Sequence, residues 1–467
     1  MIQKRILNKI CALWEIKEEF RLKVFFLAFT FLLMSGCVSI WRPLKVSIFA
    51  KLVGPELVPI AKILGLSLII PLIMLYSKLV DRLRRHYLLY CFNIFHGIGG
   101  IIFYFLLSHP VYGIANTDTN PNRLLGWFFY FFMESFCAFL STSFWSFVNS
   151  INKPKDAKYS YGLFACGSKI GGIITGGTLY LILSTNQNIP DNILLPNSLL
   201  IGSLLLFGAA TCVYFLMKKV PGYLMHGYEA VYQMEKKKTH EEKKKKGILN
   251  FLKESIEGLI IIIKNPYVLG IFSLVIFYEI IIVIFDFRVL IAANKICEKA
   301  STLTAYYCFY YFLMNSIGLV FAIFGTTPIL RILGIRISLF IFPILSFGLL
   351  LITLLFPYAS IFFWALVILR ALNYALNHPT KEVLYIPTPK TIKFKSKAWI
   401  DAFGSRIAKG TGSVFNVALK GTAPAFAILS SITLSLGLAS AWIIVVYFLG
   451  KTLQNAIKNK EVIGKKE

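Results

Sequence analysis

The stretch KVFFLAFTFLLMSGCVSIW, residues 23–41, determines how the rest of this sequence is interpreted. About 20 apolar residues in a helix cross the roughly 30 Å of hydrocarbon in a bilayer. The run lacks the alternation of apolar and polar residues that marks the strands of a membrane barrel, so it predicts a membrane-spanning helix. No short apolar core followed by small residues precedes it, and we expect this span to be retained.

The composition extends this interpretation to the whole chain. Hydrophobic residues make up 57% of the 467 residues and charged residues only 15%, a ratio that excludes a soluble globular enzyme. The formal net charge of +27 would also suit a nucleic-acid-binding protein. The basic residues, however, cluster in short segments between apolar runs, which is typical of cytoplasmic loops of a membrane protein. We therefore expect the lipid bilayer, and no nucleic acid, as a partner.

Further apolar runs of similar length follow along the chain. In the first half they lie at 57–78, 88–108, 124–149, 159–184 and 193–217. In the second half they lie at 267–293, 303–330, 332–356, 360–378, 398–418 and 422–449. Together with the first run they predict an all-α membrane protein with about 12 transmembrane helices.

A polar segment separates the two halves. Residues 218–250 include EKKKTHEEKKKKG (235–247), which cannot cross a bilayer, and 248–264 follow as an amphipathic stretch suited to the membrane surface. This pattern predicts four regions. They are an N-terminal six-helix bundle at 1–217, a cytoplasmic basic linker with an amphipathic helix at 218–264, a C-terminal six-helix bundle at 265–450 and a cytoplasmic tail at 451–467.

The distribution of basic residues predicts the orientation. Most of the Lys and Arg residues in the loops fall on the side that holds the N-terminus, including Arg82, Arg84, Arg85 and the 236–246 run. Because basic loops stay in the cytoplasm, both termini and the linker should be cytoplasmic.

The two halves resemble each other. FACGSKIGG (164–172) and DAFGSRIAKG (401–410) align at an offset of about 237, and IWRPLK (40–45) aligns at a similar offset with IFDFR (284–288). The segment DRLRR (81–85) resembles the loop after the second span of major facilitator transporters. Repeated bundles are typical of transporters, so the repeat predicts two pseudo-symmetric six-helix bundles around a central cavity, the major facilitator type.

Several chemistries have no basis in the sequence. The six His residues form no paired ligand spacing and acidic residues are sparse, so we expect neither a metal site nor a cofactor. The eight Cys residues are scattered and form no CxxC pair. The glycines of GSKIGGIITGG (167–177) are better explained by close helix packing than by phosphate binding. We expect a protein that is not an enzyme.

Ionisable residues inside the spans are the informative ones. A charge at the bilayer centre costs on the order of 3 kcal/mol, so it usually faces a cavity. These residues are Arg42, Lys45, Lys62, Glu134, Lys169, Asp286, Arg288, Arg370, Asp401, Arg406 and Lys409. Basic residues predominate, which indicates an anionic substrate with several charges. In the alternative, purely structural interpretation, Asp286 pairs with Arg42 or Arg288 and Asp401 pairs with Arg406.

At these residues the sequence resembles a known family. WRPLKVSIFAKLVGPELVPIAK (41–62), ESFCAFLSTSFWSFVN (134–149) and HPTKEVLYIPTPKTIKFKSKAWIDAFGSRIAKGTGS (378–413) are similar, in the same order, to motifs of the bacterial and plastid ATP/ADP translocases. The resemblance places that family's functional charges on Lys45, Glu134, Asp286 and Lys381. It also shows departures: Val46 stands where an acid is usual, Asp286 replaces a Glu, and Lys169 occupies a position usually held by Asn.

The resemblance implies a nucleotide transporter that exchanges ATP and ADP across a bacterial inner membrane by alternating access. Two alternatives stay open: a proton-coupled importer of other nucleotides or NAD, and a membrane receptor that binds nucleotides without moving them. The expected partners are ATP, ADP or another nucleoside triphosphate, and we expect a monomer. Trp41, Trp145 or Tyr306 could stack on the base. The expected substrate-binding residues are Arg42, Lys45, Lys62, Glu134, Asn149, Lys169, Asp286, Arg288, Lys381 and Arg406.

Overall fold

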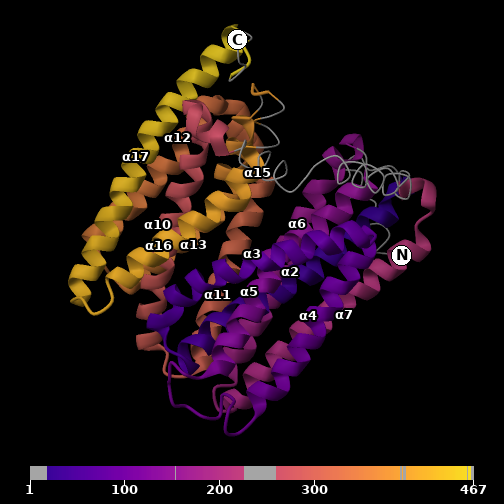
Figure 1. The fold of residues 1–467 in the computed structure, drawn as a ribbon, viewed down its shortest axis with the longest axis vertical. Helices are drawn as coiled ribbons and strands as arrows, with labels where there is room; N and C mark the ends of the chain where they lie inside the picture. The colour runs from indigo at the N-terminus through magenta and orange to yellow at the C-terminus, as the bar shows by residue number, and fades with distance from the viewer. Residues whose placement is uncertain are drawn as a thin grey trace. The chain divides into compact units, whose positions relative to one another are not determined.

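The computed structural model describes residues 18–152, 154–225, 259–324, 326–385, 387–389, 392, 396–459 and 461–463. Throughout these ranges the regular secondary structure is helical (Figure 1). Residues 226–247 of the expected linker and residues 248–258 of the expected amphipathic helix lie outside the described residues. Residues 259–264 are helical.

The helices follow the apolar runs closely. In the first half they are α2 (Glu18–Leu52), α3 (Val58–Arg82), α4 (Arg85–Ser108), α5 (Leu124–Ile151), α6 (Pro154–Thr185) and α7 (Asp191–Lys219). In the second half they are α10 (Pro266–Ile296), α11 (Ala300–Phe324), α12 (Thr326–Leu355), α13 (Ala359–Leu372), α14 (His378–Val383), α15 (Lys397–Trp399), α16 (Ser405–Ala418) and α17 (Pro424–Asn459). Short 3₁₀ turns lie at Pro55–Leu57 and Gly222–Met225, and π-helical turns at Asn373–Asn377 and Ile400–Gly404.

Many of these helices can cross a bilayer. Among the described residues, nine helices are long and apolar enough to do so. The predicted tenth and eleventh spans are instead built from shorter pieces, because π-helical turns follow α13 and precede α16. The all-α membrane fold is confirmed, and the count of about 12 spans stays a prediction.

The chain forms two compact units. Unit 1 contains 1–54, 67–242 and 297–316, and unit 2 contains 55–66, 243–296 and 317–467. Each unit therefore includes a short segment from the other half of the sequence: the first part of α11 belongs to unit 1, and the start of α3 to unit 2. The predicted bundle boundaries at 217 and 265 stay a prediction.

Unit 1 is organised around α2. This helix packs against α5, α6 and α7, and α4 packs against α5 and α7. Glycines allow the closest of these approaches: a Cβ atom on Gly171 would lie 2.2 Å from the carbonyl oxygen of Leu32. The helix-packing interpretation of the glycine-rich stretch is thereby confirmed.

Unit 2 is organised around α10. This helix packs against α13, α16 and α17, and α12 packs against α17. The buried side chains of α10 are apolar over several turns. Ile284 and Phe285, for example, are 0% exposed. Asp286 and Arg288 are charged residues within this apolar stretch of α10, which makes them candidates for a functional role in unit 2.

Candidate functional site

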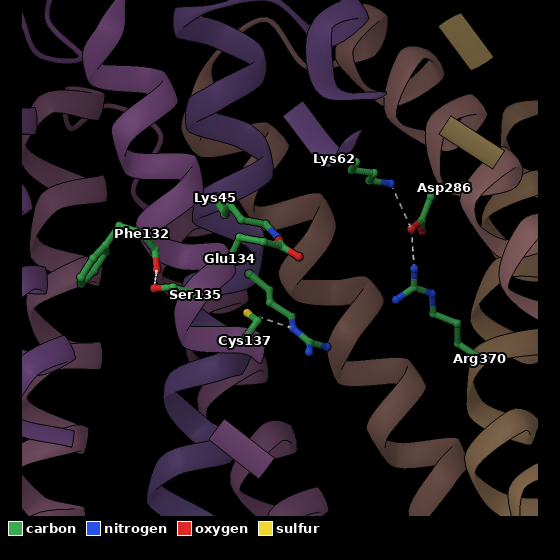
Figure 2. A network of polar contacts seen from close by, with 9 residues as sticks. Lys45, Lys62, Phe132, Glu134, Ser135, Cys137, Asp286 and Arg370 are labelled. Atoms are coloured by element: carbon green, nitrogen blue, oxygen red, sulfur yellow. Dashed lines mark hydrogen bonds and ion pairs between the residues drawn. The ribbon is translucent and has the colours of Figure 1, made fainter. Parts of the chain in front are cut away.

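In unit 1 an ion pair joins α2 to α5. The Nζ atom of Lys45 lies 2.6 Å from Oε2 of Glu134 (Figure 2). The same Nζ atom lies 4.9 Å from the centre of the Tyr130 ring. The side chains of Lys45 and Glu134 are 12% and 30% exposed, so the pair is largely shielded from solvent. Two residues that are 89 positions apart in sequence are thus brought together.

Arg42 and Lys169 lie in the same unit and contact neutral groups. Nε of Arg42 donates to Sγ of Cys137 at 3.5 Å, and Nζ of Lys169 donates to Oδ1 of Asn315 at 3.3 Å. Asn315 belongs to the part of α11 that packs in unit 1. Both cations therefore lie at helix–helix contacts of this unit.

Asn149 is placed differently from the other expected residues of unit 1. It follows Glu134 on α5 by roughly 22 Å along the helix axis, at 1.5 Å per residue. Its Oδ1 atom accepts a hydrogen bond from the hydroxyl of Tyr161. The structure does not bring Asn149 close to the Lys45–Glu134 pair.

In unit 2 the central acidic residue is Asp286 on α10. Its Oδ2 atom accepts a hydrogen bond from Arg370 on α13, and Nζ of Lys62 on α3 lies 3.7 Å from the same oxygen (Figure 2). One carboxylate is thus shared by two cations. Arg370 was not among the expected substrate-binding residues, although its charge inside the tenth apolar run was a visible signal.

Arg288 lies away from this cluster. It follows Asp286 by two positions on the helix, which places the two side chains on different faces. Its Nε atom donates to Oγ of Ser431 on α17 at 2.9 Å. The structure therefore does not join Arg288 to Asp286, in contrast to one of the structural pairings considered above.

A second polar cluster of unit 2 surrounds α14. Lys381 is 7% exposed, and its Nζ atom lies 2.9 Å from Oδ1 of Asp401. Lys397 pairs with Glu382 and lies 5.4 Å from the centre of the Tyr385 ring. Burial raises the pKa of the Tyr385 hydroxyl well above its ordinary value, and the carboxylates of Asp401 and Glu382 act in the same direction.

Arg406 is half-buried on α16. Its neighbours on this helix contact an acidic residue that was not among the expected ones. Glu279 on α10 accepts a hydrogen bond from Oγ of Ser405 at 2.7 Å and lies 3.8 Å from Nζ of Lys409. The available signal was its carboxylate inside the seventh apolar run.

The aromatic residues differ in their availability to a base. Trp41 is fully buried and its indole nitrogen donates to the carbonyl of Leu199 at 3.1 Å, so the expectation that it could stack on a base is wrong. Trp145 and Tyr306 are partly exposed, and their stacking stays a prediction. Within the residues that the structure describes, no three His, Cys, Asp or Glu side chains gather closely enough to hold a metal ion.

The arrangement of the helices is similar to that of solved membrane transporters. These include a bacterial homologue of the iron transporter ferroportin, with a TM-score of 0.59 and 11% identity over 93% of this chain and 100% of that one. A point mutant of the peptide transporter POT has a TM-score of 0.57 and 14% identity over 92% and 95% of the two chains. The protein therefore has the fold of the major facilitator type of membrane transporter.

The sequence comparison then identifies the family. The chain matches the TLC ATP/ADP transporter family over residues 3–369 and 349–453, and it belongs to that family. The resemblance stated above is thereby confirmed, and the protein is a multi-pass membrane protein of a transporter family.

Relatives come from bacteria and plastids. ADP,ATP carrier protein 4 of Rickettsia bellii (strain RML369-C) is 23% identical over 88% of this chain and 85% of its own length. ADP,ATP carrier protein 3 of Rickettsia felis (strain ATCC VR-1525 / URRWXCal2) is 24% identical over 90% and 91%. The chloroplastic ADP,ATP carrier protein 1 of Arabidopsis thaliana is 24% identical over 78% of this chain and 62% of its own length.

Proposed function

We propose that this protein exchanges ATP and ADP across a membrane by alternating access. The observation that carries the proposal is the family match, which extends over nearly the whole chain. The names of the relatives, which are ADP,ATP carrier proteins, agree with it. The charged residues that unit 1 and unit 2 hold inside apolar helices suit an anionic substrate.

The Lys45–Glu134 pair supports a role in phosphate binding. In the empty protein Glu134 neutralises Lys45, which would otherwise be an isolated charge in a poorly solvated site. A phosphate oxygen can replace the carboxylate oxygen as the acceptor of the Lys45 ammonium, because both form charge-assisted hydrogen bonds. The pair thus makes the site stable when empty and ready for an anion.

Asp286 serves the same purpose in unit 2. Its carboxylate holds Lys62 and Arg370 together, although the two cations repel each other. A phosphate that approached Arg370 would find the planar guanidinium suited to bidentate binding. Asp286 would then act as the counter-ion that is displaced, as Glu134 does in unit 1.

The setting of this activity is part of the proposal. The protein lies in the inner membrane of a bacterium with both termini cytoplasmic, acts as a monomer, needs no cofactor and performs no chemical conversion of the nucleotide. Trp145 or Tyr306 offers an aromatic surface for the base. Lys381 and Arg406 of unit 2 are further candidate contacts for the substrate.

The test is uptake of radiolabelled ATP into cells that express the protein, with and without ADP loaded into them beforehand. We expect uptake that is stimulated by internal ADP and insensitive to a protonophore. The Lys45→Gln variant should abolish most of it, whereas the exposed control Lys218→Gln should not. Protonophore-sensitive uptake of other nucleotides or NAD would favour the proton-coupled importer, and binding without uptake would favour the receptor.

A further inference from the structure

The helix α16 has one apolar and one polar face, although it belongs to a membrane protein. Ile407 and Val414 are seven positions apart, so they share a face, and they are 54% and 57% exposed. Lys409 follows Ile407 by two positions, about 200° around the helix, and its side chain is 46% exposed. Apolar side chains suit lipid, whereas an ammonium group needs water or an anion. The face that carries Lys409 therefore meets water or a polar ligand.

The polar face of α16 is turned toward α10, against which this helix packs (Figure 1). At its first turn, Oγ of Ser405 donates to Oε1 of Glu279 at 2.7 Å. At its last turn, Nδ2 of Asn416 donates to the carbonyl oxygen of Val283 at 3.2 Å. Lys409 lies between these contacts, and its Nζ atom is 3.8 Å from Oε1 of Glu279. The contact of the two helices thus holds a cation and a carboxylate together.

The Glu279–Lys409 pair is looser than the Lys45–Glu134 pair of unit 1. A separation of 3.8 Å is too long for a hydrogen bond, whereas Lys45 lies 2.6 Å from Glu134. The carboxylate of Glu279 instead accepts a hydrogen bond from the hydroxyl of Ser405. Because this hydroxyl would still satisfy the carboxylate, Lys409 can turn from Glu279 to another anion at little cost.

The pair also lies on the same face of α10 as Asp286. Seven positions separate Glu279 from Asp286, which is two helical turns or roughly 10.5 Å along the axis. Asp286 contacts Lys62 of α3. One turn after Lys62, the side chain of Leu66 lies 3.2 Å from the place of an added Cβ atom on Gly410 of α16. The three helices therefore meet in unit 2, and a nucleoside triphosphate, which is longer than this separation, can contact cations at both carboxylates.

We propose that Lys409 binds a phosphate of the transported nucleotide, and that Glu279 is the positioning residue that holds Lys409 when the site is empty. The proposal rests on the proposed nucleotide transport and adds one contact to it in unit 2. AMP can place its single phosphate at only one of the two positions along α10, whereas ATP can reach both. Lys409 then makes affinity depend on the number of phosphates, and it is a specificity-determining residue.

The first test measures AMP, ADP and ATP as competitors of radiolabelled ADP uptake. Lys409→Gln should weaken competition by ATP relative to AMP by about tenfold, which corresponds to about 1.4 kcal/mol. Lys409→Arg should retain the preference for ATP because it keeps the charge. An unchanged ATP-to-AMP ratio in a well-expressed Lys409→Gln protein would overturn the proposal.

Glu279→Gln should have the opposite effect. Without the carboxylate, no group of Glu279 competes with the phosphate for Lys409, so ATP should compete about twofold to fivefold better than in the wild type, the range expected for a loose ion pair. A pair with only a structural role would give no such gain. Weaker or unchanged competition by ATP in Glu279→Gln would therefore contradict the proposal, even if Lys409→Gln did not fold.

A second ion pair of unit 2 provides the matched control. Lys420 lies 4.0 Å from Glu56 and its side chain is 47% exposed, so its separation and exposure resemble those of Lys409. Lys420 belongs to the turn that follows α16. Lys420→Gln and Glu56→Gln should each change the ATP-to-AMP ratio by less than about twofold. A change for Lys420→Gln as large as that for Lys409→Gln would show general electrostatic attraction and contradict a specific contact.

A binding measurement distinguishes failure of this contact from failure of the transport function. Inorganic tripolyphosphate should raise the thermal unfolding temperature of the purified wild type more than that of Lys409→Gln, since ligand binding stabilises the folded state. This result in a protein that takes up no nucleotide would refute the transport proposal and keep the anion contact. Equal stabilisation of the two proteins, or none in either, would refute the contact whatever the uptake assays show.

Discussion

Lys23 shows how a single buried charge can serve the fold rather than the substrate. Its side chain is 1% exposed, and its Nζ atom donates to the carbonyl oxygens of Ile151 at 2.6 Å and Leu224 at 2.9 Å. Ile151 is the last residue of α5, where carbonyl groups have no partner within the helix. Lys23 therefore ties α2 to the end of α5 and to the turn at Gly222–Met225.

We predict that Lys23→Met destabilises the protein by about 2 to 6 kcal/mol, because two buried carbonyl groups lose a donor and each loss costs about 1 to 3 kcal/mol. Thermal unfolding of the purified protein measures the effect. The exposed Lys218→Met is the control and should change stability by less than about 0.5 kcal/mol. A Lys23→Met protein as stable as the wild type would mean that other groups satisfy these carbonyls.

The Lys45–Glu134 pair leads to a prediction that separates binding from stability. Lys45→Ala should weaken the apparent affinity for ATP by about one to two orders of magnitude, since a charge-assisted hydrogen bond contributes about 1.5 to 3 kcal/mol. The effect should be larger for ATP than for AMP, and competition of radiolabelled ATP uptake measures it. Unchanged ATP affinity in a well-expressed variant would remove Lys45 from the site.

The double variant Lys45→Ala, Glu134→Gln is the control for stability. The single variant leaves the carboxylate of Glu134 without its 2.6 Å partner, so it should lower the unfolding temperature. The double variant removes that charge and should recover the loss in stability without recovering transport. Recovery of transport would show that the pair is structural.

At the scale of elements, α6 uses glycines on two faces. Gly171 faces α2, where an added Cβ atom would lie 2.2 Å from the carbonyl oxygen of Leu32. Gly176 faces α11, where the nearest atom to an added Cβ, the carbonyl oxygen of Cys308, lies 3.6 Å away. The first contact is too close for any side chain, whereas the second is an ordinary van der Waals distance.

These distances predict opposite outcomes for the same substitution. Gly171→Ala should destabilise unit 1 by about 1 to 3 kcal/mol, because the obstacle is backbone and α6 must move away from α2. Gly176→Ala should be nearly neutral. Unfolding temperatures of the two purified variants measure the difference, and equal stability of both would contradict the close packing of α6 on α2.

At the scale of the whole molecule, the excess of positive charge has a topological meaning. The net charge of +27 is concentrated in loops and in the 236–246 run rather than along the apolar spans. Basic segments resist translocation, so the side of the membrane that holds them should be the cytoplasm. The predicted topology therefore depends on the charge distribution along the entire chain.

Reporter fusions test this topology. A reporter after Glu467 and one inserted near Lys244 should both report a cytoplasmic location, and one inserted at Asp118 should report an external location. An even number of spans before and after the linker places the Lys244 and Glu467 reporters on the same side of the membrane, and the basic residues predict that this side is the cytoplasm. An external location for the Lys244 reporter would contradict the 12-span arrangement.

The helices, the membrane setting and the family could all be predicted from the amino-acid sequence. An apolar run such as 23–41 must form a helix, because the bilayer core contains no water to bind its backbone N–H and C=O groups. In a helix these groups bind one another. Charged residues are costly inside apolar runs and are therefore easy to recognise in the sequence. Lys45, Glu134 and Asp286 could be selected on this ground without a structure. The motifs at 41–62 and 378–413 were sufficient for the family.

The pairing of the charges, in contrast, depends on how the helices pack. Asp286 pairs with Arg370, 84 positions away, rather than with the nearby Arg288, because two positions along a helix turn the side chain to another face. Burial of Trp41 and the capping role of Lys23 likewise depend on which helices are neighbours. Apolar periodicity specifies that a helix is buried but not its neighbours, so these contacts cannot be obtained from local sequence.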